Sequence, residues 1–406
     1  MSTFVTKSKK NLRENLTELR TPQGVAGRNI LAAETKAQAF ELTGSGRKNI
    51  VHNGAMTVSQ EYQTASHNID GWSVMGVDRF RGTVRPSTGV FSAEQNIITG
   101  NHPEGFSRSL LLTQQSVTTE AANDYYNLLT KIEGNDVAHL GLGTEYAKTV
   151  TVSFWVKSSI TGRYAFGMQN EAGSSARQSY VTDYNIDAPN AWEYKTFVIP
   201  LSQTGTWYND NQAGLQLNWN FGRGTAYQTS NLNIWQTNVN ALSHTGTVDW
   251  IGNSGATWEL TGVQMEIGEA ATPFEHRPYS EELILCQRYF CSGFPEGTTI
   301  ENGTSGNGTN DGVNGWVAFT NSACRSPYIY YPVVMRTTPS ISLYSVGAVG
   351  TGKWAIFNGS SWQDVVSSSI DSNSKHFNVR ENSSSFTMGV GKAYLIKGQW
   401  TASAEM

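Results

Sequence analysis

The chain has 406 residues and a formal net charge of −4 at pH 7, which suggests two or three domains and excludes a global basic field of the kind that attracts nucleic acid. Charged residues make up only 15% of the chain, against 40 glycines and 11% aromatic residues, a composition typical of strand-rich proteins with many tight turns rather than of disordered chains. No apolar run approaches the ~20 residues that cross a bilayer, and the polar first ten residues lack the apolar core of a secretory signal.

A short amphipathic helix is predicted at the N-terminus. Leu12, Leu16 and Leu19 have the 4–3 spacing of a coiled-coil seam. Because an isolated helix of this length is marginal in water, we expect these leucines to bind a partner, either copies of the same chain or another protein. A frayed, solvated terminus is the alternative. The rest of the region 1–50 is either a further Ala-rich helix or a linker.

The segment 51–279 is predicted to fold as an antiparallel jelly roll or β-sandwich. Its clearest strand is 149–159, where apolar residues at alternate positions indicate one buried face. The stretches 191–200 and 214–222 have the same character. At Gly262 the apolar pattern passes from one set of alternate residues to the other, which predicts a β-bulge.

A short connecting helix is predicted over 280–291, with Ser280 as its N-cap and two glutamates in its first turn. The remainder, 292–406, is predicted to be a smaller β-domain, because it is rich in strand and turn signals and in glycine and serine. The run 353–366 predicts a hairpin around Asn358-Gly359. The fold class is therefore mainly β, with two short helices.

Several segments resemble a family of bacteriophage tail-fibre and virion structural proteins. The stretch 260–290 contains the pattern "ATPFE–RP–EEL–CQRYF", which in that family joins a jelly-roll domain similar to carbohydrate-binding modules to a C-terminal β-domain. The stretch 48–60 resembles the family's opening "N–NGAM–V–Q" strand, and 77–80 resembles its "DRF" element. The closing WTASAEM and the segment 330–341 agree with it.

The resemblance implies a phage virion protein, homotrimeric, synthesised and assembled in the host cytoplasm. The leading hypothesis is a tail fibre. Its N-terminal helix would bind a tail adaptor or another virion protein, and its β-domains would contact host cell-surface polysaccharide, with 292–406 as the host-contacting tip. A head fibre or capsid decoration protein is the second hypothesis, and a polysaccharide depolymerase is the third. A secreted carbohydrate-binding module outside any virus is the fourth. Neither nucleic-acid binding nor membrane insertion is expected.

No catalytic residues are predicted. Hydrolysis of a glycosidic bond needs two carboxylates ~5–9 Å apart, and the candidates are Glu259 with Glu266 or Asp183 with Asp187. The strand pattern places both glutamates away from the core, as solubilising side chains on an outer face or at a protomer contact. We therefore expect a protein that is not an enzyme.

No cofactor and no metal site are predicted either. The seven histidines are scattered without metal-ligand spacing, and Cys286, Cys291 and Cys324 are expected to stay reduced. The run GAVGTGK at 347–353 lacks the hydroxyl residue and the helix of a phosphate loop. A structural calcium ion, with oxygen ligands from residues such as Asp210, remains a hypothesis without a motif.

Aromatic side chains are the candidates for glycan contact, because sugars bind flat apolar rings together with a few placed polar groups. Trp155 is a candidate because it lies on the polar face of its strand, although a neighbouring element could cover it. Further aromatics cluster in 205–235 and in the C-terminal domain, where Tyr328 and Tyr330 also occur. The full set of candidates is Trp155, Trp207, Tyr208, Tyr227, Trp316, Trp354 and Trp362.

Overall fold

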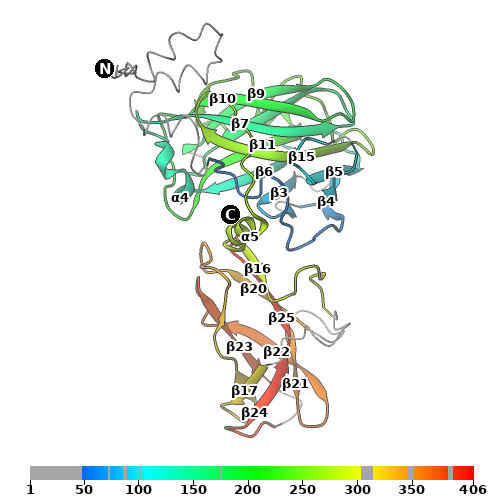
Figure 1. The fold of residues 1–406 in the computed structure, drawn as a ribbon, viewed down its shortest axis with the longest axis vertical. Coiled ribbons are helices and arrows are strands. Elements are labelled where there is room, and N and C mark those ends of the chain that lie inside the picture. Colours follow the sequence, from blue (N-terminus) through cyan, green and yellow to red (C-terminus); the bar gives the residue numbers. More distant parts are fainter. Residues whose placement is uncertain are drawn as a thin grey trace, which may run out of the picture.

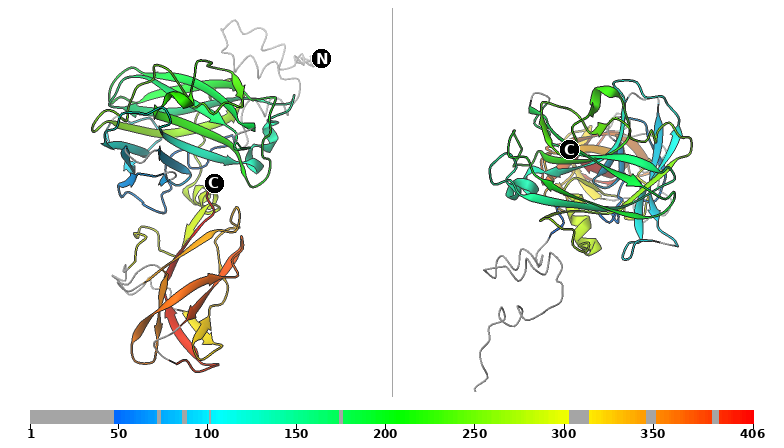
Figure 2. Two further views of the ribbon diagram at one scale, coloured as in Figure 1. Left: turned by 180° about the vertical axis from the view of Figure 1, so that it is seen from behind. Right: turned by 90° about the horizontal axis from the view of Figure 1, so that it is seen from above.

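The computed structural model describes residues 48–406 except 72–73, 86–88, 101, 174–175, 303–313, 346–351 and 383–386. The predicted N-terminal helix with Leu12, Leu16 and Leu19 lies outside the described residues. Figure 1 shows two β-units, one above the other along the longest axis, with a helix between them. Figure 2 shows the same arrangement from behind and from above. The protein is mainly β, as the sequence predicts.

The first unit is a sandwich of two antiparallel sheets. The six-stranded sheet has the order β1-β4-β5-β15-β7-β10. Its strands are β1 (His67–Ile69), β4 (Val90–Ile97), β5 (Arg108–Ser116), β15 (Thr257–Ile267), β7 (Thr149–Ser158) and β10 (Glu193–Pro200). The seven-stranded sheet has the order β13-β9-β8-β11-β6-β3-β2. Its strands are β13 (Trp235–Thr237), β9 (Gln178–Ile186), β8 (Gly162–Gln169), β11 (Ala213–Arg223), β6 (Tyr125–Glu133), β3 (Phe80–Arg85) and β2 (Val74–Val77).

Alternation along the strands places one hydrophobic core between these two sheets. On β7, Val150, Val152, Phe154 and Val156 are all fully buried in that core, as the period of two predicts. The predicted bulge is also present. The register of β15 against β7 shifts at Gly262, which has a φ of 63°. A left-handed backbone of this kind favours glycine.

The second unit contains a closed ring of strands. Its seven-stranded sheet has the order β18-β17-β24-β21-β22-β23-β19, and an additional β18–β23 pairing closes six of these strands. The strands of the sheet are β18 (Ala323–Arg325), β17 (Asn314–Ala318), β24 (Ala393–Lys397), β21 (Lys353–Phe357), β22 (Trp362–Ile370), β23 (His376–Asn382) and β19 (Ile329–Tyr330). Of these, β19 pairs with β23 outside the closed ring. The hairpin predicted around Asn358-Gly359 is β21 paired with β22.

The remaining elements are short. A three-stranded sheet of β16 (Phe290–Ser292), β25 (Gln399–Ser403) and β20 (Ser340–Tyr344) lies at the end of the second unit that faces the helix. The others are β12 (Gln228–Thr229), β14 (Ser243–His244), α4 (Gly134–Val137), η1 (Ala138–Leu140) and η3 (Thr225–Tyr227). Among the described helices, none is long and apolar enough to cross a membrane.

The helix between the units is α5 (Tyr279–Gln287), which begins one residue before the predicted range of 280–291 and ends four residues short of its end. It begins after Pro278, so Ser280 is not its N-cap, and Glu281 and Glu282 occupy its first turn. A proline at this point agrees with its fixed φ and missing N–H, which a helix start tolerates. All three cysteines are free and buried.

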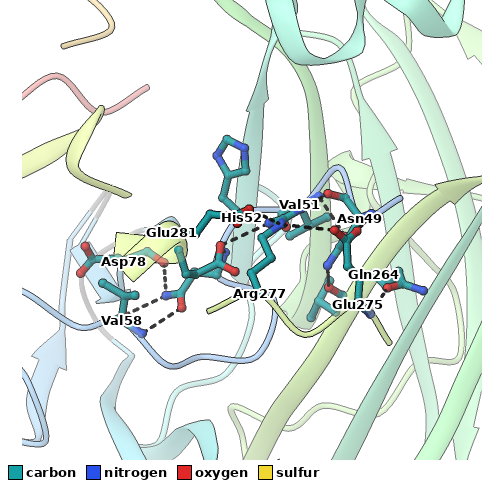
Figure 3. A network of polar contacts seen from close by, with 12 residues as sticks. Asn49, Val51, His52, Val58, Asp78, Gln264, Glu275, Arg277 and Glu281 are labelled. Carbon is teal, nitrogen blue, oxygen red and sulfur yellow. Dashed lines mark hydrogen bonds and ion pairs between the residues drawn. The ribbon is translucent and has the colours of Figure 1, made fainter. Parts of the chain in front are cut away.

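Two segments more than 200 residues apart in sequence bind each other beside this helix. We call this contact the clasp, made by residues 48–58 with Gln264, Glu275, Arg277 and Glu282. Figure 3 shows Arg277 reaching toward the backbone of Asn49 and Val51, both of whose carbonyl oxygens accept its guanidinium. The Glu275 carboxylate accepts the backbone N–H groups of Lys48 and Asn49, each at 2.6 Å. The clasp fixes the start of the first unit to the segment that leads into α5.

A set of buried charges lies where the two units meet. Glu133 accepts hydrogen bonds from Arg288 at 2.6 and 2.8 Å and from the Tyr289 hydroxyl at 3.0 Å. The guanidinium carbon of Arg79 is 3.4 Å from the centroid of the Tyr289 ring, and its Nη1 pairs with Glu405. These contacts join the residue before β3 and the last residue of β6 to the residues directly after α5 and to Glu405 near the end of the chain.

Candidate functional site

A groove with a volume of about 380 Å³ crosses the outer face of the seven-stranded sheet of the first unit. Strand alternation explains its position. On β6, the side chains of Tyr126, Leu128 and Ile132 are in the core, whereas Tyr125 and Asn127 line the groove. Its volume is in the range of small-molecule sites.

A β-bulge places the most buried cation of the groove. The register of β11 against β6 shifts between Asn220 and Gly222, so that Arg223 pairs with Tyr125 on the outer face. Without the extra residue, Arg223 would alternate into the core, two positions after Phe221. The guanidinium carbon of Arg223 instead lies 4.9 Å from the centroid of the Tyr125 ring and 5.1 Å from that of Tyr227. Burial lowers the pKa of Arg223 to about 10.

The groove concentrates positive charge. Among its lining residues the only carboxylate side chain is Glu171, which lies 3.6 Å from Lys131 and 3.7 Å from Arg177. The cations are five in number: Arg81, Arg85, Lys131, Arg177 and Arg223. Burial lowers the pKa of Lys131 and opposes its charge, while Glu171 favours that charge. The groove is therefore locally basic in a chain whose net charge is −4.

Amide side chains form the polar part of the lining. Asn127 on β6 lies directly opposite Asn220 on β11, and both are buried. Within the described part of the chain, Asn127 Oδ1 and Asn220 Nδ2 have no hydrogen-bond partner. Gln169, Gln216 and Asn240 also line the groove. Amides, two tyrosine rings and cations together give the mixture of apolar surface and placed polar groups that binds a polar ligand.

Of the aromatic residues predicted to contact glycans, one lies in this groove. Tyr227 is half-buried beside Arg223 and lines the groove. Trp155 is half-buried on the other sheet, with its ring 5.1 Å from that of Tyr194 on the adjacent strand. Trp207 is half-buried against Trp235, and its indole N–H donates to Thr204 O at 2.9 Å. Tyr208 is half-buried in the same loop. The predicted residues therefore do not form a single site.

The structure contradicts two of the predicted contacts in the C-terminal unit. Trp316 and Trp354 are each only 1% exposed. Their rings lie 5.4 Å apart, and the Trp354 indole N–H donates to Gln399 O at 3.0 Å. Both side chains belong to the core of the second unit, because a small barrel needs large residues to fill its interior. Neither presents a face to a glycan.

Other aromatic residues of the second unit are accessible. Trp362 is 38% exposed, with Lys397 Nζ 4.7 Å from its ring centroid. Tyr330 is 67% exposed, and its ring lies 5.4 Å from that of His376. Tyr328, also exposed, lies 4.1 Å from the same histidine ring. Amphipathic rings at the surface of this unit are thus Trp362, Tyr328 and Tyr330.

The carboxylates considered for hydrolysis are not solvated, contrary to the prediction. Glu259 and Glu266 are 5% and 3% exposed. Glu259 pairs with Lys157 at 2.5 Å and accepts from the Ser109 hydroxyl at 2.9 Å. Glu266 accepts from the backbone N–H and the hydroxyl of Thr272 at 2.8 and 2.7 Å. Side chains of neighbouring strands and the segment after β15 cover this face, which the period of two could not reveal.

The two aspartates of the second candidate pair have different surroundings. Asp183 pairs with Arg163 and lies 3.4 Å from His244, while Asp187 is exposed.

Among the described residues, no group of three or more His, Cys, Asp or Glu side chains could hold a metal ion. Asp210 accepts the backbone N–H of Gln212 at 2.9 Å, in an exposed turn.

The cations of the groove are the residues that sequence reasoning missed. Each is isolated in sequence, on a strand or loop separate from most of the others. Arg81 and Arg85 do share a face of β3, because they are four residues apart. The signal that could have found them is this alternation of polar residues with core residues. The pairing that gathers them with Arg223 is long-range and cannot be read from the sequence.

No protein-family model matches this sequence, and a search of the curated proteins finds no match. Among solved structures, the chain is similar to the enzymatically active domain of tailspike protein 4 of bacteriophage CBA120. The match has 14% identity and a TM-score of 0.28, and covers 54% of this chain and 21% of that chain. The matched region thus spans about a fifth of that tailspike domain.

Two further similar structures come from Clostridium thermocellum. One is a family 11 carbohydrate-binding module, with 9% identity and a TM-score of 0.27, matched over 50% of this chain and 97% of the module. The other contains modules of endo-1,4-β-D-xylanase 10B, with 13% identity and a TM-score of 0.26, matched over 56% of this chain and 30% of that chain. Likeness of this degree does not carry a function to this chain.

Proposed function

We propose that this chain is a structural component of a phage virion, a tail fibre that binds host-surface polysaccharide and does no covalent chemistry. The segments that resemble virion proteins support the first part. The groove on the seven-stranded sheet carries the second part, because it combines two tyrosine rings, amides and cations in about 380 Å³. Attachment to the tail through Leu12, Leu16 and Leu19 is part of the same proposal.

The absence of enzymatic activity is part of the proposal too. Its support is that both glutamates of the first candidate pair are buried and hydrogen-bonded to internal partners. Incubation with host capsule or lipopolysaccharide should release no reducing ends. Release that depends on Glu259 or Glu266 would instead favour the depolymerase.

Glycan binding is tested by isothermal titration of the full chain with a panel of bacterial surface polysaccharides. We expect saturable binding that weakens when Tyr227→Ala removes one ring of the groove. The control is Tyr146→Ala, because Tyr146 is an exposed tyrosine that does not line the groove. Equal loss in both variants, or binding to none of the panel, would contradict the proposal.

Location and copy number need separate measurements. Immunogold electron microscopy with an antibody against 292–406 should label the tail. Label over the head would favour a head fibre or capsid decoration protein. We further propose a homotrimer, whose molar mass by light scattering should be three times the 44.5 kDa of the chain. A monomer at micromolar concentration would contradict it.

A further inference from the structure

We propose that the groove selects an anionic polysaccharide, and that an acidic group of one sugar residue, a carboxylate or a phosphate, binds at Arg223. This inference rests on the proposed function and deepens it by naming the class of glycan.

The environment of Arg223 is the first reason. Its side chain is 3% exposed, and its Nε and Nη1 have no hydrogen-bond partner among the described residues. The charged groups that act on its pKa are Tyr125, Tyr227 and Arg177, and no carboxylate is among them. Burial has removed hydration from Nε and Nη1, and a buried cation without a carboxylate beside it is costly. An anion in the groove would supply the charge-assisted hydrogen bonds that this position lacks.

The two tyrosines make this position suitable for a sugar. The rings of Tyr125 and Tyr227 lie 5.3 Å apart at an interplanar angle of 82°, and the guanidinium of Arg223 lies close to both. The rings hold the guanidinium by cation–π contact and so limit its rotamers. They also border the groove with apolar surface. An acidic sugar can therefore place its charged group on Arg223 and its ring against tyrosine.

A second group of cations suits a polymer with repeated charges. Arg81 and Arg85 are four residues apart on one face of β3, which corresponds to ~13 Å along the strand. Arg85 pairs with Tyr125 in register, close to Arg223, and Arg81 pairs with Leu129, toward Lys131. The groove thus has cations toward both ends, while Asn127 lies between them.

The shape of the site favours a glycan over a nucleic acid. Nucleic-acid sites present basic surface along an extended phosphate backbone. Here the cations are confined to one groove of a chain with net charge −4. The buried amides of Asn127 and Gln216 accompany them, and amides suit the hydroxyls of a sugar.

The test is titration of the full chain with polygalacturonate, a phosphodiester-linked teichoic acid, neutral dextran and single-stranded DNA. We expect one of the two acidic polysaccharides to bind at least tenfold more tightly than dextran, and that affinity to fall as sodium chloride rises. Carboxylate and phosphate sources are distinguished by which of the two binds. Arg223→Gln should weaken binding at least tenfold.

Two further variants keep the test decisive. Arg85→Gln removes an exposed cation of the same groove, so it can be read even if Arg223→Gln does not fold. Arg163→Gln removes a cation of the same sheet that pairs with Asp183 and does not line the groove. We expect weaker binding from the first and unchanged binding from the second.

The outcomes separate this inference from the proposed function. Dextran bound as tightly as the acidic polymers, with Arg223→Gln unchanged, overturns anionic selectivity but leaves glycan binding in place. Single-stranded DNA bound as tightly as the best polysaccharide overturns the inference in favour of a general polyanion site. Binding to no polysaccharide overturns the inference and the proposed function together.

Discussion

Backbone conformation and close contacts at single residues of the clasp explain why the stretch 48–60 contains asparagine and glycine where it does. Asn53 and Met56 have φ values of 56° and 57°, in the left-handed region that side chains rarely adopt. The Asn53 side chain stabilises its turn by donating to Val58 O and Asp78 O, each at 2.8 Å. Gly54 accepts the backbone N–H of Val263 at 2.9 Å. This close approach of two backbones leaves no room for a side chain at Gly54.

The first prediction concerns this glycine. Gly54→Ala should lower the free energy of unfolding by about 1–3 kcal/mol, because the new Cβ would overlap with the carbonyl group of Val263. Urea denaturation measures it. Gly315→Ala is the control, because a Cβ there would meet nothing within 4 Å, and it should change stability by no more than about 0.5 kcal/mol. Equal effects at both positions would show that the close approach does not matter.

A second residue-scale prediction concerns pH. Glu381 is fully buried in the second unit and accepts from the Ser367 hydroxyl at 2.7 Å. Burial raises the pKa of Glu381 to about 8, above an ordinary value of 4.5. Because the folded-state pKa is the higher one, the neutral form stabilises the fold, and this stability is lost as pH rises from about 4.5 through 8.

Glu381→Gln should therefore raise the Tm relative to the wild type at pH 9 and leave the difference small at pH 4. The expected effect is bounded by about 1.4 kcal/mol per unit of pKa difference. Thermal unfolding at the two pH values measures it. A Tm difference that is the same at pH 4 and pH 9 would mean that Glu381 does not titrate in this range.

At the scale of elements, irregularities rather than regular strands place the important side chains. The bulge in β15 at Gly262 moves Val263 and Met265 into the core, and the bulge in β11 moves Arg223 out of it. The segment between β15 and α5 has no regular structure of its own. Its geometry depends on Arg277, which binds the backbone of 49–51 and pairs with Glu282 at 3.3 Å.

The third prediction follows from that dependence. Arg277→Met should destabilise the protein by about 3–5 kcal/mol, because it leaves the buried Glu282 carboxylate without its cation and two carbonyl groups without their donor. Arg163→Met is the matched control. It breaks a partly exposed pair with Asp183 and should cost less than about 1 kcal/mol. Chemical denaturation measures the free energy of unfolding of both variants. Similar losses of free energy in the two would argue against a structural role for the clasp.

At the scale of the molecule, the segments that resemble virion proteins meet at one place. Residues 48–60 and 260–290 form the clasp, and Arg79 of the DRF element contacts both Tyr289 and Glu405. These segments therefore form the joint between the two β-units. The groove lies next to this joint, since Arg81 pairs with Glu405 at 3.5 Å and Met406 is part of the lining.

The fourth prediction tests the joint. Wild-type protein should unfold in one calorimetric transition, because buried ion pairs couple the two units. The double variant Arg288→Ala/Glu405→Ala removes a partner from each pair and should unfold in two transitions. The control Arg325→Ala/Asp371→Ala breaks an exposed pair within the second unit and should keep one transition. Two transitions in the wild type would show that the units are independent.

The sequence by itself determined the mainly β fold, the buried face of β7, the bulge at Gly262, the connecting helix and the β21–β22 hairpin. These depend on alternation, glycine and turn chemistry, which act between residues close in sequence. It also indicated reduced cysteines.

Only the tertiary structure decided which faces are covered and which scattered residues meet. Alternation distinguishes two faces of a strand but does not identify what packs on them. It could therefore not show that Trp316 and Trp354 are core, or that Glu259 is buried by neighbouring strands. The cationic groove is decided in the same way. Arg85 and Arg223 are more than 100 residues apart in sequence, and they are brought together because β6 pairs with both β3 and β11.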